Sequence, residues 1–143
     1  MKFSILLPPV GQKRARSRAF KSGHGPDAKY IATTYKDKGQ RQEENKLLTL
    51  MYEHKPPMPL QGPLSLHIQA MFPIPKSKPL KWRTGALEGK IKPTTKPDAD
   101  NLAKHILDVM SGVFFEDDRQ IVFLCVQKSY SNLPRWVIEL EEF

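Results

Sequence analysis

Residues 96–121, KPDADNLAKHILDVMSGVFFEDDRQI, decide the fold of this chain. Pro97 disfavours a helical conformation at the residue before it. Asp98 or Asp100 can cap a helix that begins there, because a carboxylate accepts backbone N–H groups and is favoured by the helix dipole. Gly112 suits the left-handed position that follows a helix end. The stretch therefore predicts a helix that begins at one of these acids and ends before Gly112.

This helix is predicted to have one buried face and one charged face. The apolar residues that recur at helical spacing are Leu102, Ile106, Val109 and Met110. They are expected to face the core. Asp100, Lys104 and Asp108 lie four residues apart and share another face. The β-branched and aromatic run over residues 121–126 then predicts a buried strand.

Carboxylates lie near the predicted ends of these two elements. They are Asp98, Asp100, Asp117 and Asp118. If the strand packs beside the helix, these acids approach one another, and carboxylates at close range raise one another's pKa and usually bind a cation. Magnesium fits best because it prefers hard oxygen ligands and keeps positions for water and phosphate, with manganese as a substitute. The alternative is that Asp98 only caps the helix and the Asp117–Asp118 pair forms a solvated turn.

The same stretch resembles the signature of the RusA-type Holliday junction resolvases, which are crossover junction endodeoxyribonucleases often found in bacterial and prophage genomes. Their pattern is D-x-D-N-x-x-K, an acidic residue later in the helix, a short apolar turn and D-D-x-Q-[IV]. Here it is filled by Asp98, Asp100, Asn101, Lys104, Asp108, Asp117, Asp118, Gln120 and Ile121. Because this ordered set is long, it is more specific than an isolated pair of acids.

The resemblance implies roles for these residues. The family's metal-binding catalytic acids correspond to Asp98, Asp100 and Asp118. Lys104 corresponds to the catalytic lysine, which would stabilise the transition state or position the attacking water. The acids would hold Mg²⁺, which activates water and neutralises charge on the scissile phosphate. Asp117 and Asp108 are candidates for a supporting role.

Length and charge bound the rest of the chain. Its 143 residues can bury one moderate core, which predicts a single domain over 1–143. A net charge of +8 favours a polyanionic partner. Cys125 is the only cysteine, so it forms no internal disulfide; it is expected to pack within its strand and fits a reducing cytoplasm. No apolar run is long enough to cross a bilayer, so no membrane partner is expected.

Two basic segments are predicted to be loops that contact DNA. Residues 12–30 show no periodicity, and residues 73–97 form a long stretch with several prolines. The candidate phosphate-binding side chains are Lys13, Arg14, Arg16, Arg18, Lys76, Lys78, Lys81 and Arg83. Trp82 is a candidate for stacking on bases or for packing in the core. In each segment the alternative is a solvated loop without a partner.

Hydrophobic patterning elsewhere predicts the remaining elements. They are a first strand over 3–7, a helix over 35–54, a strand over 64–72, and strands over 121–128 and 135–141 joined as a hairpin. The fold class is therefore α+β, with a mixed or antiparallel sheet of about four strands and two main helices. A four-way junction has strands to cut at symmetry-related points, so a two-fold homodimer is expected.

The resemblance thus implies a Mg²⁺-dependent endodeoxyribonuclease that resolves four-way DNA junctions by paired symmetric nicks in recombination and repair. It would act in the cytoplasm, at the nucleoid, and be encoded by a bacterium or phage. The chain has no Gly-rich phosphate loop, zinc-ligand spacing or nucleophilic Ser or Cys constellation. Two alternatives remain: a magnesium-dependent nuclease for other branched DNA, and a non-catalytic basic protein that binds nucleic acid.

Overall fold

The computed structural model describes residues 1–13 and 15–143. The fold is α+β, with a four-stranded mixed sheet and a separate two-stranded sheet. The strands are β1 (Lys2–Ile5), β2 (Arg16–Ser22), β3 (Lys29–Tyr35), β4 (Leu64–Pro73), β5 (Ile121–Ser131) and β6 (Arg135–Glu142). The α-helices are α1 (Lys38–Met51), α2 (Leu80–Leu87) and α3 (Ala99–Met110). Short 3₁₀ turns are η1 (Gly25–Asp27), η2 (Tyr52–His54) and η3 (Asp118–Gln120).

The main sheet has the strand order β1-β6-β4-β5. β4 lies between β6, which is antiparallel to it, and β5, which is parallel to it. The predicted hairpin between β5 and β6 is therefore wrong, because the two strands flank β4 instead of pairing with each other. β4 buries alternate residues along most of its length, and ladders on both sides pair its backbone groups.

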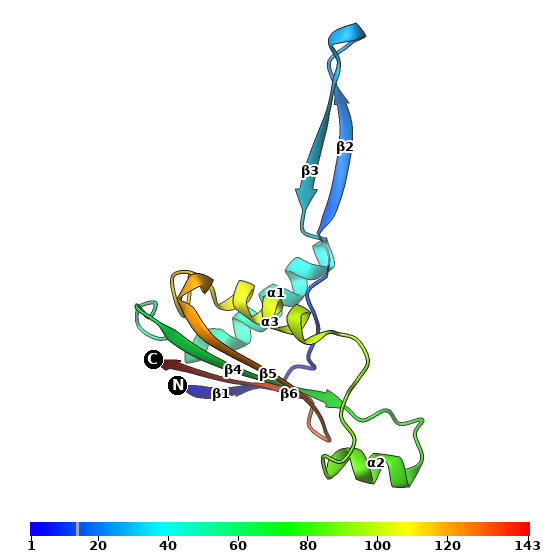
Figure 1. Cartoon of the computed structure of the whole chain (residues 1–143), viewed down its shortest axis with the longest axis vertical. Coiled ribbons are helices and arrows are strands. Elements are labelled where there is room, and N and C mark those ends of the chain that lie inside the picture. The colour runs from blue at the N-terminus through cyan, green and yellow to red at the C-terminus, as the bar shows by residue number, and fades with distance from the viewer. Residues whose placement is uncertain (14) are drawn as a thin grey trace.

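The hydrophobic core lies between the sheet and two of the helices. Helices α1 and α3 cover one face of the sheet, and α2 lies beyond its end (Figure 1). All four apolar residues predicted to face inward from α3 are buried, which confirms that face. The strands predicted over 64–72 and 135–141 are also present, and β6 turns Trp136, Ile138 and Leu140 into the core. No helix of the described residues is long and apolar enough to cross a membrane.

We expected a loop over residues 12–30, but residues 16–30 form most of a projecting hairpin. β2 and β3 pair antiparallel from Arg16↔Tyr35 to Ser22↔Lys29 and extend away from the sheet (Figure 1). Every residue of both strands is exposed, so no alternation of buried and polar positions marks them in the sequence. Tyr35 belongs to β3, and α1 starts at Lys38 instead, where Asp37 caps it by accepting a hydrogen bond from the Gly39 amide at 2.8 Å.

β5 is a strand, as predicted, but its first half is not buried. It forms an edge of the sheet, and Val122, Phe123 and Leu124 are 59%, 46% and 42% exposed. Cys125, which we expected to pack within this strand, is also exposed, so that expectation is wrong. An apolar run predicts burial only if other elements cover the strand, and no described strand pairs with the outer edge of β5.

The segment over residues 73–97 is not a loop throughout, because it contains α2. Trp82 on this helix is half-buried and meets Tyr130 of β5 edge-on, with ring centroids 5.5 Å apart. Lys78 lies over the Trp82 ring, with its Nζ 5.1 Å from the ring centroid. Trp82 is therefore packed against the end of the sheet, so α2 is attached there.

Candidate functional site

The start of α3 presents three charged side chains to solvent. Asp98 occupies the N-cap position but its side chain makes no capping hydrogen bond, and Asp100 lies in the first turn. Lys104 follows one turn later, and all three residues are exposed. Among the described residues no ion pair or hydrogen bond occupies these side chains, so both carboxylates are free to bind a ligand. Hard oxygen donors of this kind fit Mg²⁺.

Two other segments fix the position of this helix start. The Gln12 amide donates to the Asn101 carbonyl at 3.1 Å, and Gly11 packs so closely that an added Cβ would lie 2.5 Å from Cβ of Pro97. Lys128 of β5 donates from Nζ to the Thr95 carbonyl at 2.6 Å. These positioning contacts were not predicted, since nothing local in the sequence marks a contact between residues so far apart.

Asp117 and Asp118 lie where η3 leads into β5, and they differ in their surroundings. Asp117 accepts hydrogen bonds from the amide and Nε of Arg119 at 2.9 and 2.8 Å. The side-chain hydrogen bond from Arg119, helped by its amide, lowers the pKa of Asp117 to about 2. Gln120 completes a capping box with Asp117. Asp117 is therefore engaged in local structure, whereas Asp118 is exposed.

The two groups of acids lie at opposite ends of α3. The helix has 12 residues, which at about 1.5 Å per residue makes it roughly 18 Å long. The chain turns tightly after it, with the Gly112 amide donating to the Phe115 carbonyl at 2.7 Å and Gly112 in the expected left-handed conformation. β5 then starts beside the end of α3 and runs back along it (Figure 1).

The expected approach of Asp98 and Asp100 to Asp118 therefore does not occur within one chain. In residues 1–13 and 15–143, no group of three or more His, Cys, Asp or Glu side chains is placed to hold a metal ion. β5 does pack beside α3, which was the condition for the acids to approach one another, but the first residues of β5 lie beside the end of α3 and not beside its start (Figure 1). The catalytic roles of these acids stay a prediction.

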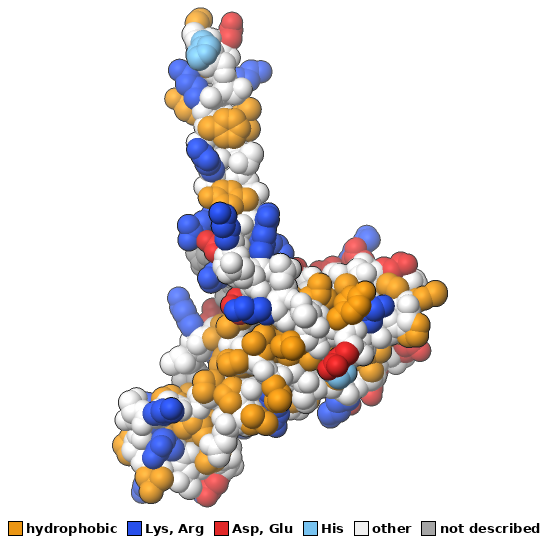
Figure 2. Space-filling model, turned by 180° about the vertical axis from the view of Figure 1, so that it is seen from behind, with side chains coloured by type: hydrophobic (Ala, Val, Ile, Leu, Met, Phe, Trp, Pro, Cys, Tyr) orange, Lys and Arg blue, Asp and Glu red, His pale blue; other side chains and the backbone are white. Residues whose placement is uncertain are grey.

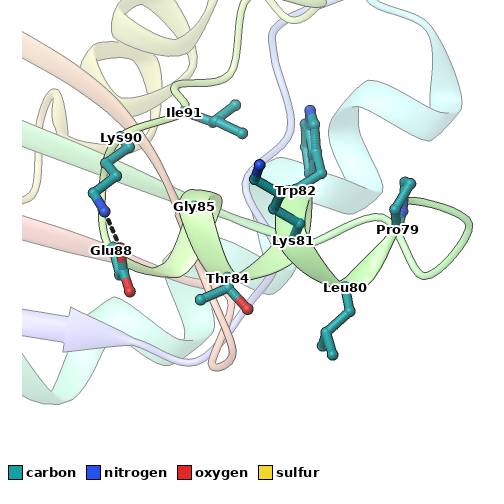
Figure 3. Close-up of a pocket in the computed structure, with 9 residues that line it drawn as sticks. All are labelled: Pro79, Leu80, Lys81, Trp82, Thr84, Gly85, Glu88, Lys90 and Ile91. Atoms are coloured by element: carbon teal, nitrogen blue, oxygen red, sulfur yellow. Dashed lines mark ion pairs between the residues drawn. The ribbon is translucent and has the colours of Figure 1, made fainter.

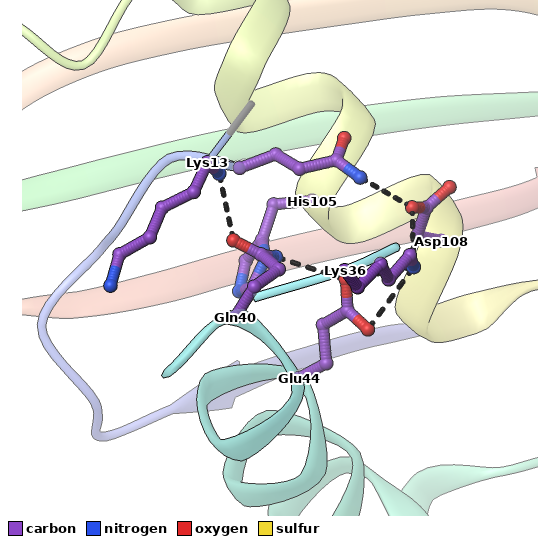
Figure 4. Close-up of polar contacts among 7 residues, drawn as sticks. Lys13, Lys36, Gln40, Glu44, His105 and Asp108 are labelled. Atoms are coloured by element: carbon purple, nitrogen blue, oxygen red, sulfur yellow. Dashed lines mark hydrogen bonds and ion pairs between the residues drawn. The ribbon is translucent and has the colours of Figure 1, made fainter. Parts of the chain in front are cut away.

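Asp108, a candidate supporting acid, is engaged in a polar cluster at the base of the hairpin (Figure 4). Its carboxylate accepts hydrogen bonds from Gln12 Nε2 at 2.6 Å and from Lys36 Nζ at 3.0 Å. Lys36 also donates to Glu44 of α1 at 3.0 Å. Burial acts to lower the pKa of Lys36, but the hydrogen bonds to Asp108 and Glu44 outweigh it and raise that pKa. Asp108 thus helps to join α1, α3 and the hairpin base.

His105 extends this cluster into the core. Its ring is fully buried, and Nδ1 lies 3.1 Å from Gln40 Nε2, while Gln40 Oε1 accepts a hydrogen bond from the Lys13 amide at 2.7 Å. Burial lowers the pKa of His105, despite the carboxylates of α1 and α3 nearby. His105 is therefore neutral at pH 7 and fixes the contact between α1 and α3. Its spacing with the buried residues of α3 is the signal that places it on the inner face.

The candidate DNA-binding residues lie in two separate parts of the molecule. Lys13 precedes the hairpin, Arg18 projects from β2, and Arg16 pairs with Asp37 at 2.9 Å. Arg14 lies outside the described residues. The others, on or just before α2, are Lys76, Lys78, Lys81 and Arg83. Figure 2 shows Lys and Arg side chains on both the hairpin and the opposite end of the molecule.

An open hollow of about 870 Å³ lies along α2 (Figure 3). Its lining residues are Pro79, Leu80, Lys81, Trp82, Thr84, Gly85, Glu88, Lys90 and Ile91. None of the predicted catalytic acids borders it. The exposed acids at the start of α3 are therefore the stronger candidate site, because they match the chemistry that the motif predicts.

Comparison with known proteins supports the motif. The family model described as endodeoxyribonuclease RusA matches residues 7–141, which include both groups of acids and the hairpin. A relative named uncharacterized protein YqaN, from Bacillus subtilis (strain 168), is 31% identical over 144 residues. That alignment covers 99% of this chain and 96% of the relative.

Proposed function

This chain belongs to the RusA endodeoxyribonuclease family, and from that membership we propose that it resolves four-way DNA junctions by paired symmetric nicks that depend on Mg²⁺. The family establishes a nuclease, a hydrolase of phosphodiester bonds in DNA. The observation that carries the proposal further is the free pair of carboxylates at the start of α3, followed by the exposed Lys104 one turn along the helix. The junction substrate fits a chain with a net charge of +8.

We assign the metal to Asp98, Asp100 and Asp118, whose exposed carboxylates are hard oxygen ligands. A bound Mg²⁺ would activate water and neutralise charge on the scissile phosphate. Lys104 lies one helical turn beyond Asp100, where its ammonium can stabilise charge on the phosphate or orient the water. Asp117 supports the site indirectly by capping η3 beside Asp118.

A homodimer resolves the separation of the acids. No strand of the described residues pairs with the outer edge of β5, where Val122, Phe123 and Leu124 are exposed. An exposed apolar edge strand favours pairing with another strand. The second half of β5 is partly covered by α2 and Thr95, which leaves the first half as the free edge. Two copies can therefore pair their β5 strands antiparallel about a two-fold axis.

Such pairing brings the missing acid to the helix start. If the axis passes near Phe123, Asp118 of the partner subunit lies opposite Lys128, since both are five residues from the axis. Lys128 contacts the Thr95 carbonyl, three residues before Asp98. Each site would then combine Asp98 and Asp100 from one chain with Asp118 of the partner subunit, and the two-fold axis would supply one site for each strand to be cut.

The test is cleavage of a mobile four-way junction beside a linear duplex of the same sequence, with Mg²⁺ or with EDTA. We expect paired nicks at the junction that disappear with EDTA and in Asp100→Asn, while this variant still binds junction DNA. Lys104→Ala should cut poorly and yet bind. Glu141→Gln, which removes an exposed carboxylate of β6, is the control and should cut normally. Equal cutting of the linear duplex would contradict junction specificity.

Two other functions have specific outcomes in the same assay. A nuclease for other branched DNA would cut flaps or forks at least as fast as the four-way junction. A non-catalytic DNA-binding protein is favoured by the distance between the acids within one chain, if the chain stays monomeric. Binding without cutting, across divalent metals, together with a monomeric mass in solution would support that second function. We place the activity in bacterial or prophage recombination and repair, in the cytoplasm at the nucleoid.

A further inference from the structure

The hairpin formed by β2 and β3, here called the arm, contributes no buried residue to the core. All residues of both strands are exposed, including Phe20 at 44% and Ile31 at 42%. An isolated two-stranded hairpin is only marginally stable in water. Large exposed apolar side chains on such a hairpin indicate a surface that contacts a partner. The arm projects well away from the sheet, so that partner need not contact the sheet (Figure 1).

The register of the strands divides the arm into two faces that differ in chemistry. Residues paired directly across an antiparallel ladder share a face, and successive pairs alternate. One face carries the pairs Arg16↔Tyr35, Arg18↔Thr33, Phe20↔Ile31 and Ser22↔Lys29. The other carries Ser17↔Thr34, Ala19↔Ala32 and Lys21↔Tyr30. The first, here called the Arg18 face, combines cations with the largest apolar pair, whereas the second is mostly small residues.

The charge of the arm identifies the partner as a polyanion. Residues 16–35 contain four cationic side chains and one acidic side chain, Asp27. Arg16 is engaged by Asp37 at the arm base. Arg18, Lys21 and Lys29 form no ion pair within the part of the chain that the structure describes. Along the arm, Lys and Arg side chains alternate with hydrophobic ones (Figure 2).

We propose that the arm lies as a two-stranded ribbon in the major groove of a DNA duplex and contacts it through the Arg18 face. This inference rests on the proposed function, because it describes how that nuclease would hold the DNA duplex next to the strand that it cuts. The cations would bind phosphates at the groove edges, and the Phe20↔Ile31 pair would contact thymine methyl groups or base edges. The face of small residues would point away from the DNA.

The dimensions of the arm fit this partner. The major groove is about 12 Å wide and admits a two-stranded β-ribbon. Seven residues per strand at about 3.4 Å each give a length of roughly 24 Å, which covers about seven base pairs at roughly 3.4 Å per pair. The cationic Arg18 face favours DNA over a second copy of this chain, because DNA carries a negative charge at every phosphate whereas this chain has a net charge of +8.

The test compares two lysines near the arm tip that lie on opposite faces. Lys29→Gln removes one charge from the Arg18 face, and Lys21→Gln removes one charge from the other face. Binding to a linear duplex and to a four-way junction is measured across a salt series in EDTA. We expect Lys29→Gln, and likewise Arg18→Gln, to weaken binding several-fold and to reduce the salt slope by about one. Lys21→Gln should keep the wild-type slope.

Other results overturn the proposal. Equal losses in Lys21→Gln and Lys29→Gln would show attraction by overall charge without a contacting face. Unchanged binding in all three variants would remove the arm from the DNA interface. If arm variants instead lower the dimer fraction in sedimentation while each dimer binds DNA normally, the partner is a second copy. Thermal unfolding checks that each variant is folded, as expected for substitutions at exposed positions.

A second measurement separates this inference from the proposed function. Binding in EDTA requires no cleavage, so a wild-type protein that never cuts DNA would refute the nuclease assignment and leave the face-specific binding result intact. Phe20→Ala tests the apolar contact in the same assay. It should weaken duplex binding without changing the salt slope, because it removes no charge. An unchanged affinity in Phe20→Ala would show that the Phe20↔Ile31 pair does not contact the DNA.

Discussion

A site shared between two chains predicts that two inactive variants restore activity to each other. Asp100→Asn damages the acids at the start of α3, and Asp118→Asn damages the acid at its far end. Each homodimer would lack one ligand in both sites. In the heterodimer both substitutions fall in one site, and the other site combines an intact Asp100 with an intact Asp118 of the partner subunit.

The expected magnitude follows from this arrangement. One intact site out of two gives about half of the wild-type rate for the first nick. Paired cuts should be nearly absent, because the second site lacks two ligands. If instead each site lay within one chain, both sites of the heterodimer would carry one substitution and no activity would return.

The assay is nicking of a four-way junction by heterodimers purified through two different affinity tags after co-expression. The matched control is a heterodimer of wild type with the double variant Asp100→Asn/Asp118→Asn. If each site is shared between two chains, both sites of this control heterodimer carry one substitution and are inactive. If each site lies within one chain, the site of the wild-type chain stays intact. Activity in this control and none in the first heterodimer would refute the shared site and the pairing of β5 strands from which we derive it.

Other substitutions test the packing around the site. Gly11→Ala would place a Cβ 2.5 Å from Cβ of Pro97, and overpacking of this kind destabilises a protein by about 1–3 kcal/mol. The variant should therefore unfold at a lower temperature and nick DNA more slowly. An unchanged melting curve would contradict the contact. In the folded chain the pKa of His105 lies below its ordinary value of 6.5. As the pH falls, the imidazole is therefore protonated in the unfolded chain before it is protonated in the folded chain. The free energy of unfolding should then decrease as the pH drops from 6.5 through the folded pKa. Urea unfolding at a series of pH values measures this, and His105→Gln should lack that part of the slope. Ile106→Ala opens a cavity in the core at a fully buried position and should cost about 2–5 kcal/mol in urea unfolding, whereas the exposed Lys104→Ala on the same helix should cost less than about 0.5 kcal/mol.

Local patterns in the sequence predicted α3 and β4 well. The start, end and buried face of α3 depend on residues within a few positions of one another, such as Asp98 and Gly112. The alternation in β4 likewise depends on its own residues. Caps, turns and hydrophobic periodicity depend on residues close together in the sequence, so they can be predicted without knowledge of the rest of the fold. The motif that identified the family lies in the same stretch.

Strand pairing and exposure could not be predicted in this way. The arm buries nothing, so β2 and β3 lack the hydrophobic alternation by which strands are found. β5 has the composition of a buried strand, yet it lies at an edge, because burial depends on which elements the rest of the chain places beside it. The parallel pairing of β4 with β5 likewise joins segments about 57 residues apart.

The amino-acid sequence by itself indicated which residues are candidates for the chemistry: two carboxylates at the start of a helix, a lysine one turn later, and further acids after the helix. Only the tertiary structure decided where those acids lie. Asp98 and Asp100 are at one end of α3 and Asp118 is near the other, because β5 runs back along the helix from its end. The physical reason is that spacing along a chain determines residue types and local geometry, whereas distance between elements depends on how the sheet orders its strands.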